Sequence, residues 1–254
     1  MLSILSGIGN LIFQKLELFG QLVLLTIDTI KRLRFLDIKR LVKQMAHLGV
    51  DSLPIVLLTI FFTGVVITIQ TAQEFIKYGA QSTVGGIVTI AMGRELAPVL
   101  TGVVMAGRVG AAITAELGSM KVTEQIDALR VMAVNPVAYL VVPRLIACII
   151  MCPILVVFAN VIGIIGSYII TTFYDSITTQ MFINSIKVFV VPHDITGGMI
   201  KACFFGAIIA IVGCHKGLNT AEGAEGVGTA TTESVVLSII LIFFFNCILS
   251  ALLY

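Results

Sequence analysis

The stretch that decides the fold is VGGIVTIAMGRELAPVLTGVVMA, Val84 to Ala106. It is long enough to cross a bilayer, because a spanning helix needs about 20 predominantly apolar residues. Arg94 and Glu95 nevertheless lie side by side near its middle, where each charge costs at least about 2.5 kcal/mol on insertion scales. Neighbours on a helix point about 100° apart and cannot pair well with each other. Pro98 also removes the amide that would bond the carbonyl of Arg94, so both charges and this carbonyl need other partners.

The composition places this stretch in an integral membrane protein. The chain has 254 residues, of which 58% are hydrophobic and 12% are charged, with a mean hydropathy of +1.08. A soluble domain is about 25% charged. Apolar runs of spanning length occupy residues 53–70, 84–106, 145–170, 198–214 and 235–254. They are too continuous for barrel strands, which alternate every second residue. We therefore predict a single all-α membrane domain, residues 1–254, with five transmembrane helices.

The first 50 residues follow a different pattern, which predicts interfacial helices. From residue 35 to residue 48 the apolar side chains occupy one half of a helical wheel, and basic side chains such as Lys39, Arg40 and Lys43 occupy the other. A basic amphipathic helix of this kind lies in the membrane interface. Residues 11–30 approach the hydropathy of a span but are interrupted by charged side chains. They form a second interfacial or partly inserted helix or, alternatively, a sixth span.

Basic residues in the connecting segments predict the orientation, because short cytoplasmic loops carry an excess of lysine and arginine. One side of the predicted bundle carries Lys31, Arg32, Arg34, Lys39, Arg40, Lys43, Arg108, Lys121, Arg130, Arg144 and Lys216. The other side carries Lys77 and Lys187. This asymmetry predicts a multi-pass protein with a cytoplasmic N-terminus and a C-terminus on the far side of the membrane.

Small residues follow the second span at a spacing that favours close helix packing. Gly107, Ala111 and Ala115 are four residues apart, and Gly110 and Gly118 lie beside them. Such spacing lets the backbones of two helices approach each other. We therefore predict that this helix packs tightly against a neighbouring span.

A short charged helix is predicted from Thr123 to Ala133, within a cytoplasmic coupling region at residues 115–136. Thr123 has the chemistry of an N-cap, acidic residues occupy the first turn, and Pro136 ends the helix. The charged residues are Glu124, Asp127 and Arg130, and the apolar residues Ile126, Leu129 and Met132 recur three apart. This pattern fits a helix that docks on a partner protein or one that rests on the membrane surface, and the residues alone do not decide between the two.

Longer segments of the sequence carry a family resemblance. The run RELAPVLTGVVMAGRVGAAITAELGSMKVTEQIDALRVMAVNP, Arg94 to Pro136, and YLVVPR at 139–144 closely resemble the MlaE/YrbE permease family. These are the membrane subunits of ABC transporters that work with MCE-domain proteins. GVGTATTESVV, Gly226 to Val236, resembles the segment of that family that enters the last span. The resemblance covers more than half of the chain.

The resemblance implies a homodimer of permeases, each with an N-terminal interfacial helix and five spans. It places them in the inner membrane of a Gram-negative-type bacterium or in the inner envelope of an organelle. A cytoplasmic MlaF-like ATPase would bind ATP and Mg²⁺, with a small STAS-type, MlaB-like regulator in some systems. A hexameric MlaD-like MCE protein would lie on the far side, and the cargo would be phospholipid. The sequence contains no G-x-x-x-x-G-K-[ST] phosphate loop, so we expect no cofactor in this chain. Its few, dispersed basic residues predict no nucleic-acid partner.

These implications assign roles to the charged stretch and to the cytoplasmic connection. We expect Arg94, Glu95 and Pro98 to line or gate a lipid-accepting cavity at the dimer interface, because a guanidinium can bind a phosphate in bidentate fashion. The alternative is a structural network of ion pairs. We expect ATPase coupling to involve Glu116, Thr123, Glu124, Ile126, Asp127, Leu129 and Arg130. Lys201, another charge inside a predicted span, is expected to snorkel outward.

Other functions fit the sequence less well. A proton-coupled secondary transporter would use Glu95 as its proton site, but such proteins show internal repeats with interrupted helices, and this sequence shows no such repeat. A lipid-modifying enzyme built on Ser185, His193 and Asp194 lacks a nucleophile-elbow pattern, so we predict no catalytic residue. The five cysteines lie in apolar runs without a C-x-x-C pair or a histidine at ligand spacing, so neither a metal site nor a disulfide is expected.

Overall fold

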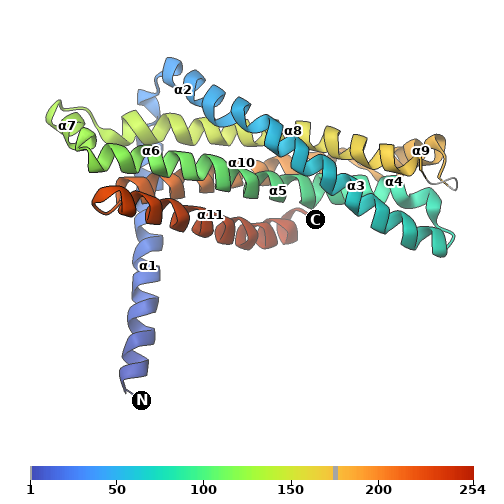
Figure 1. The fold of residues 1–254 in the computed structure, drawn as a ribbon, viewed down its shortest axis with the longest axis horizontal. Helices are drawn as coiled ribbons and strands as arrows, with labels where there is room; N and C mark the ends of the chain where they lie inside the picture. Colours follow the sequence, from blue (N-terminus) through green and yellow to red (C-terminus); the bar gives the residue numbers. More distant parts are fainter. Residues whose placement is uncertain (1, 174–176) are drawn as a thin grey trace.

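The structure, a computed structural model, describes residues 2–173 and 177–254, except for the side chains at 2–12, 14, 15 and 35 (Figure 1). In this part of the chain the regular secondary structure is helical, without a β-strand. Five helical units among the described residues are long and apolar enough to cross a membrane: Ile38–Lys77, Gln81–Val122, Val137–Thr171, Pro192–Leu218 and Gly223–Leu253. The predicted all-α membrane fold with five spans is therefore confirmed.

The first three units contain irregular turns, and the last two are continuous. The first unit consists of α2 (Ile38–Gln44), a π-helical turn η2 (Met45–Gly49), a 3-10 turn η3 (Val50–Ser52) and α3 (Leu53–Lys77). The second consists of η4 (Gln81–Thr83), α4 (Val84–Ala91), the π-helical turn η5 (Met92–Leu96), α5 (Ala97–Met105), the π-helical turn η6 (Ala106–Gly110) and α6 (Ala111–Val122). The third consists of the π-helical turn η7 (Val137–Val141) and α8 (Val142–Thr171), and the last two are α10 (Pro192–Leu218) and α11 (Gly223–Leu253). Outside these units lie α1 (Leu2–Lys31), η1 (Leu33–Phe35), α7 (Gln125–Val131) and α9 (Thr179–Phe189).

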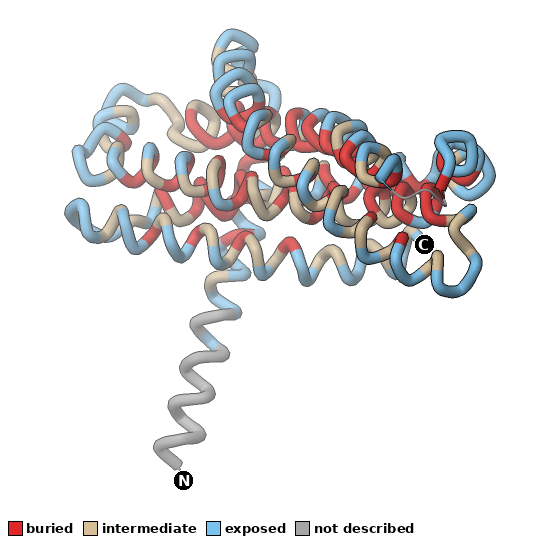
Figure 2. Tube along the Cα trace, turned by 45° about the vertical axis from the view of Figure 1, so that its right-hand side comes forward, coloured by how far each residue is buried: buried red, intermediate tan, exposed pale blue. Residues whose placement is uncertain are grey.

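The helices α8 and α10 form the centre of the bundle. α8 packs against α3 and α10, and α10 also packs against α6 and α11. Figure 2 shows that buried positions are concentrated along the inner helices. In the most apolar stretch of each unit, 56% of the residues are buried in the third and fourth units but 11% in α11. α11 thus presents a long apolar face, which is expected of a surface covered by lipid or by another chain.

The N-terminal segments differ from their predicted arrangement. The amphipathic segment 35–48 does not form a separate interfacial helix, because from Ile38 onward it belongs to the same helical unit as the first span. α1 instead runs crosswise to the spans, as Figure 1 shows. It contacts the bundle through Gln21, whose Oε1 lies 3.1 Å from His215 Nε2 on α10, and through the buried Leu22. α1 is therefore not aligned with the five long helical units.

Local chemistry explains where these helices begin. Asp37 caps α2, because its Oδ1 accepts a hydrogen bond from Lys39 N at 2.9 Å. Pro54 lies in the first turn of α3, a position that tolerates a missing N–H. The turns η2 and η3 keep the backbone right-handed and helical from Gln44 to Leu53. The amphipathic segment and the apolar run are therefore continuous, and the chain changes direction before Asp37 instead.

The helix α6 packs closely against α10 around Gly110. Thr114 Oγ1 donates a hydrogen bond to the carbonyl of Gly213 at 3.1 Å. A Cβ added at Gly213 would lie 3.2 Å from the carbonyl oxygen of Gly110, and one added at Gly110 would lie 3.4 Å from Ile209 Cγ2. The small residues thus allow an interhelical approach that larger side chains would prevent.

The remaining small residues of the predicted packing stripe behave differently from one another. A Cβ at Gly118 would lie 2.9 Å from Thr220 Oγ1, so Gly118 is also closely packed. Ala111 and Ala115 are half-buried. Gly107 does not take part, because it is exposed and an added Cβ would have no neighbour within 4 Å.

The helix α7, which we predicted to be cytoplasmic, begins later in the sequence than expected. Thr123 does not cap α7; it follows the end of α6, and its hydroxyl donates to the carbonyl of Ser119 at 2.8 Å. Glu124 then turns the chain with a φ of 59°, and α7 follows from Gln125. Ile126 points into the bundle and is part of the main hydrophobic core. This residue is therefore not available to a partner protein, contrary to the prediction.

Candidate functional site

A buried lysine reaches the charged stretch of the second span. Lys201 on α10 is 0% exposed, and its Nζ lies 2.7 Å from Glu95 Oε1. The prediction that Lys201 snorkels outward is wrong, because the side chain is enclosed by the bundle and meets a carboxylate there. Gly198 permits this approach, since a Cβ at that position would collide with the carbonyl oxygen of Gly93.

The same ammonium group satisfies the carbonyl that Pro98 leaves without a helical partner. Lys201 Nζ donates to Arg94 O at 3.0 Å, and Pro98 has no N–H to offer this carbonyl. The chain passes through this region in the π-helical turn η5, a distortion that is frequent at functional sites. The carbonyl is therefore bonded within the protein.

The helix α11 completes the polar environment of Glu95. Asn246 Nδ2 donates to Glu95 Oε2 at 2.9 Å. Ser250 Oγ accepts from Lys201 Nζ at 2.8 Å and lies 2.8 Å from Glu95 Oε1, to which it donates. The turn η5 and the helices α10 and α11 thus converge on one carboxylate, which is hydrogen-bonded through both of its oxygens.

Arg94 pairs with a different acid, at the N-terminal end of α10. Its guanidinium lies 2.7 Å from Asp194 Oδ1, and Asp194 Oδ2 accepts a hydrogen bond from Val191 N at 2.9 Å. The ring of Tyr254 covers this pair, with its centroid 4.5 Å from Arg94 Cζ, and its hydroxyl donates to Asp194 O at 3.1 Å. Arg94 and Glu95 thus point to separate partners, as their positions on the helix require.

The cluster has a buried side and an accessible side. Lys201 and Asp194 are buried, whereas the side chains of Glu95 and Arg94 are 40% and 37% exposed. One carboxylate and one guanidinium are therefore accessible at the surface of the chain, each fixed by a buried partner. A guanidinium can bind a phosphate in bidentate fashion, and a carboxylate can accept hydrogen bonds from an ammonium group. The accessible edge is complementary to a group that carries both charges.

The residues predicted for ATPase coupling fall into separate groups. Glu116 pairs with the buried Arg144 at 2.8 Å and joins α6 to α8. Asp127 pairs with Lys121 at 3.2 Å and with Arg130 at 2.8 Å, so it holds α7 on the end of α6. Glu116, Asp127 and Arg130 thus already have partners within the chain.

The outward face of α7 is formed by a different set of residues. Glu124 has no ion pair or side-chain hydrogen bond within the described part of the chain. Val131 is 88% and Met132 is 64% exposed, whereas Ile126 is buried and Leu129 packs against the edge of the core. Exposed apolar side chains next to a charge are what a helix that docks on a partner presents. Val131 escaped the sequence analysis because it falls between the residues that recur three apart.

The residues of the imagined hydrolase do not form a catalytic group. Ser185, on α9, accepts a hydrogen bond from Gly86 N at 2.7 Å, where α9 packs against α4. His193 Nε2 lies 2.9 Å from the carbonyl oxygen of Leu253. Asp194 binds Arg94 instead of the histidine. Each side chain has a structural partner of its own.

Several members of the charged cluster were missed in the sequence. Lys201 could have been predicted as a member of the cluster, because a lysine within an apolar run needs a partner as much as Glu95 does. Asn246 and Ser250 lie four residues apart and therefore share a helix face, which marks one side of the last span as polar. Tyr254 carried no signal.

A bundle of five helices of spanning length, with a charged cluster between them and a short exposed helix at one end, is the architecture of a multi-pass membrane protein, and charges within such a bundle are typical of transporters. A model of the family "Permease MlaE" matches residues 41–252. The chain therefore belongs to the MlaE permease family, and it is an ABC transporter permease. Permeases of this kind are membrane subunits rather than enzymes, and they work with an ATPase partner.

Individual relatives agree with this assignment. A protein of Synechocystis sp. named "Probable ABC transporter permease protein" is 48% identical over 212 residues, which cover 84% of this chain and 81% of the relative. A protein of Rickettsia prowazekii with the same description is 40% identical over 214 residues, covering 84% of this chain and 83% of the relative. "Protein TRIGALACTOSYLDIACYLGLYCEROL 1, chloroplastic" of Arabidopsis thaliana is 39% identical over 212 residues, covering 84% of this chain and 61% of the relative.

Proposed function

We propose that this chain is the permease subunit of an ABC transporter that moves phospholipid between the inner membrane and an MCE-domain carrier, driven by ATP hydrolysis on a separate subunit. The observation that carries the proposal is the cluster at Glu95, in which one carboxylate and one guanidinium are accessible while their partners are buried. Charges inside a membrane bundle are costly and mark substrate pathways. A zwitterionic headgroup offers a phosphate to Arg94 and an amine to Glu95.

The comparisons support a lipid as the cargo. The Arabidopsis relative is named after trigalactosyldiacylglycerol, which is a lipid. The helix α11 turns Asn246 and Ser250 toward the cluster and presents an exposed apolar face beside them, which would let acyl chains lie next to the charged headgroup site. Headgroup and acyl chains of one phospholipid are thus accommodated by neighbouring surfaces.

The proposal assigns partners to the ends and faces of the bundle. An MlaF-like ATPase docks on the exposed face of α7, with an MlaB-like regulator bound to the ATPase. A second copy of the chain covers the apolar face of α11 and brings the two Glu95 clusters toward a shared cavity. An MlaD-like MCE hexamer lies at the opposite end, on the periplasmic side of the inner membrane, where the C-terminus also lies. The distribution of basic residues supports this orientation.

The decisive experiment measures ATP-dependent lipid transfer by the complex. The tagged full chain is purified gently, its co-purifying proteins and lipids are identified by mass spectrometry, and the complex is reconstituted in vesicles with a fluorescent phospholipid. Glu95→Gln removes the accessible charge, and we expect transfer to slow by about tenfold, which corresponds to about 1.4 kcal/mol. The matched control is Glu74→Gln, because Glu74 is an exposed glutamate paired with Lys77 near the end of α3.

Two results would contradict the proposal. Full transport by both Glu95→Gln and Glu95→Ala would mean that the cluster is a purely structural network of ion pairs. Transfer driven by a proton gradient without ATP, and lost in Glu95→Gln, would make the chain a proton-coupled secondary transporter. Recovery of an ATPase, an MCE-domain protein and bound phospholipid with the tagged chain supports the proposed assembly.

A further inference from the structure

A basic cleft opens between the start of the first span and the start of the third. It has a volume of about 500 Å³. The side chains that matter here are Arg40, Lys43 and His47 from α2 and η2, Glu116 from α6, and Tyr139 and Arg144 from the third unit. The lining shares no residue with the cluster at Glu95. The cleft is therefore a separate feature of the bundle, at the end where the chain leaves α1.

The cleft is positively charged. Among the described residues that line it, Arg40, Lys43 and Arg144 carry permanent positive charges and Glu116 is the acid. Arg144 forms the floor, where its guanidinium is held by the carbonyl of Leu140 at 2.7 Å and by Glu116 at 2.8 Å. Glu116 is thus paired with Arg144, while its own side chain is 48% exposed, and the other permanently charged side chains of the lining, Arg40 and Lys43, are cationic.

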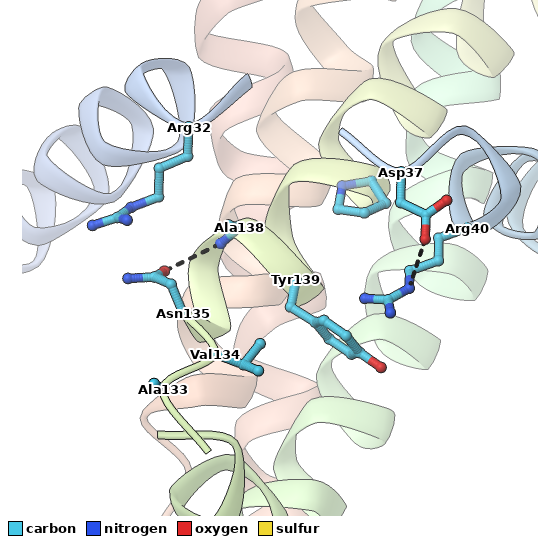
Figure 3. Close-up of a pocket in the computed structure, with 9 residues that line it drawn as sticks. Arg32, Asp37, Arg40, Ala133, Val134, Asn135, Ala138 and Tyr139 are labelled. Atoms are coloured by element: carbon cyan, nitrogen blue, oxygen red, sulfur yellow. Dashed lines mark hydrogen bonds and ion pairs between the residues drawn. The ribbon is translucent and has the colours of Figure 1, made fainter. Parts of the chain in front are cut away.

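The cation Arg40 is held rigidly in the wall. Figure 3 shows its guanidinium over the ring of Tyr139, and Arg40 Cζ lies 3.4 Å from the ring centroid. Asp37 pairs with Arg40 Nε at 3.2 Å. A second cleft of about 380 Å³, with Arg32 in its lining, shares Arg40 and Tyr139 with the first. Arg40 therefore presents a fixed charge to both clefts, and a fixed cation binds an anion with less loss of conformational entropy.

The cation Lys43, unlike Arg40, is not held by other side chains. It lies one helical turn beyond Arg40, is exposed, and makes no ion pair or side-chain hydrogen bond within the part of the chain that the structure describes. His47 lies a further turn along, where its Nδ1 is 3.2 Å from Asp51 Oδ2. The cleft thus combines a fixed guanidinium with an unpaired ammonium group on one helix face, as a site for an oxyanion such as a phosphate requires.

Apolar side chains also line the cleft, namely Met120, Leu140 and Pro143. Others are exposed on the same helical unit as Arg40, outside the cleft. Ile38, Val42 and Val50 are exposed, at 71%, 58% and 53%. The unit continues directly into the first span, and α1 lies crosswise at the same end (Figure 1). A phosphate in the cleft would therefore have apolar side chains beside it, on a helical unit that enters the membrane. A lipid satisfies both features, whereas a soluble phosphate satisfies one.

We propose that this cleft binds the phosphate of an anionic phospholipid from the surrounding leaflet, at a site distinct from the transported cargo. Arg40 and Lys43 contact the phosphate, Arg144 contributes positive potential from below, and the acyl chains leave the cleft past Met120 and Leu140. Basic pockets between spans on the cytoplasmic side recognise lipid headgroups in this way. The proposal rests on the cytoplasmic placement of this end and not on the identity of the cargo. The bound lipid fixes the start of the first span against the third.

The test is a lipid titration of the full chain, purified with its co-purifying partners in a neutral detergent. Thermal unfolding is followed while short-chain phosphatidylglycerol, phosphatidylcholine or inorganic phosphate is added. We expect phosphatidylglycerol to raise the unfolding temperature of the wild type. Lys43→Gln should raise its half-saturating concentration about fivefold, because one lysine near an anionic membrane surface contributes about 1 kcal/mol. Lys43→Arg keeps the charge and should titrate like the wild type.

Lys39→Gln is the matched control, because Lys39 is on the same helix but does not line either cleft. An equal loss in Lys39→Gln and Lys43→Gln would overturn the proposal, since it would indicate a diffuse charge effect. An equal response to phosphatidylcholine would overturn it too. Stabilisation by inorganic phosphate that matches phosphatidylglycerol would assign the cleft to a soluble anion. Unfolding of unliganded Lys43→Gln at the wild-type temperature shows that the variant is folded.

Discussion

Lys201 and Glu95 form an ion pair in which the two members have unequal access to the surroundings. The ammonium group is fully buried and the carboxylate is 40% exposed, with 2.7 Å between Nζ and Oε1. Lys201 also bonds the carbonyl of Arg94 and the hydroxyl of Ser250. The lysine therefore positions the carboxylate and the distorted backbone beside it, while the glutamate remains available to a ligand. The two residues should respond differently to substitution.

Replacing Lys201 should destabilise the fold. Lys201→Met leaves Glu95 without its cation and the Arg94 carbonyl without its donor. We expect a loss of about 3 kcal/mol, the low end of the range for breaking a buried ion pair, because Glu95 is partly exposed. Thermal or chemical unfolding of the purified chain measures the loss. The double variant Glu95→Gln with Lys201→Met should recover part of it, because it removes both charges together.

Lys187→Met provides the control for this prediction. Lys187 is exposed on α9, so its loss should change stability by less than about 0.5 kcal/mol. An unfolding temperature of Lys201→Met equal to that of the wild type would mean that the pair contributes nothing to stability. A double variant that is less stable than Lys201→Met would show that the hydrogen bonds of Glu95 with Asn246 and Ser250 stabilise the fold even without the lysine.

The sequence predicted the residues of the charged cluster that lie on the second span, but not their partners on other helices. Arg94, Glu95 and Pro98 are local signals, because two charges and a proline within an apolar run require partners whatever the fold. Their partners depend on which helices are neighbours, and this is decided by packing over the whole chain. Lys201 was misjudged because snorkelling depends on depth in the bundle, and the apolar run around it began later in the prediction than α10 begins in the structure.

The sequence predicted the five spans, but it did not predict the residues at which the helices begin and end. Spanning length and hydropathy are properties of continuous segments, so all five were found. The helices extend beyond the apolar runs because polar residues can continue a helix outside the bilayer, as in the unit that begins at Ile38. The segment 35–48 was assigned to a separate interfacial helix because amphipathicity does not reveal whether the next residue turns the chain. Asp37 is the residue in the sequence that marks where this helical unit begins, because its side chain caps α2.

Packing between α6 and α10 predicts opposite outcomes for neighbouring glycines. Gly110→Leu should lower stability by about 1–3 kcal/mol, because overpacking a closed helix interface displaces its neighbours, and the first neighbour here is Ile209. Gly107→Leu should leave the stability of the isolated chain unchanged, because no atom lies within 4 Å of an added Cβ. Both variants are compared by thermal unfolding at a detergent concentration that keeps the chain monomeric. Equal destabilisation by the two would show that Gly107 also faces a helix.

The exposed face of α7 predicts which substitutions separate the permease from its ATPase. Val131→Asp places a charge on a side chain that is 88% exposed, so the permease should fold normally. A charge in the apolar part of an interface is costly, because it must be desolvated, and we expect the ATPase to be lost on purification. Charge reversal at Glu124 should act in the same direction. Charge reversal at Asp127 would not separate docking from folding, because it also breaks the ion pairs that hold α7 on α6.

The control for the α7 prediction is Val188→Asp, at an exposed valine of α9 at the other end of the bundle. It adds the same charge to a similarly exposed side chain of a short helix, and should leave ATPase binding and ATP turnover intact. Purification of a whole complex with normal ATP turnover from Val131→Asp and from Glu124→Lys would remove α7 from the docking surface. Loss of the ATPase from Val188→Asp as well would indicate that surface charge alone weakens the complex. Loss from the α7 variants alone places the ATPase at the end of the bundle where α6, α7 and the third span meet.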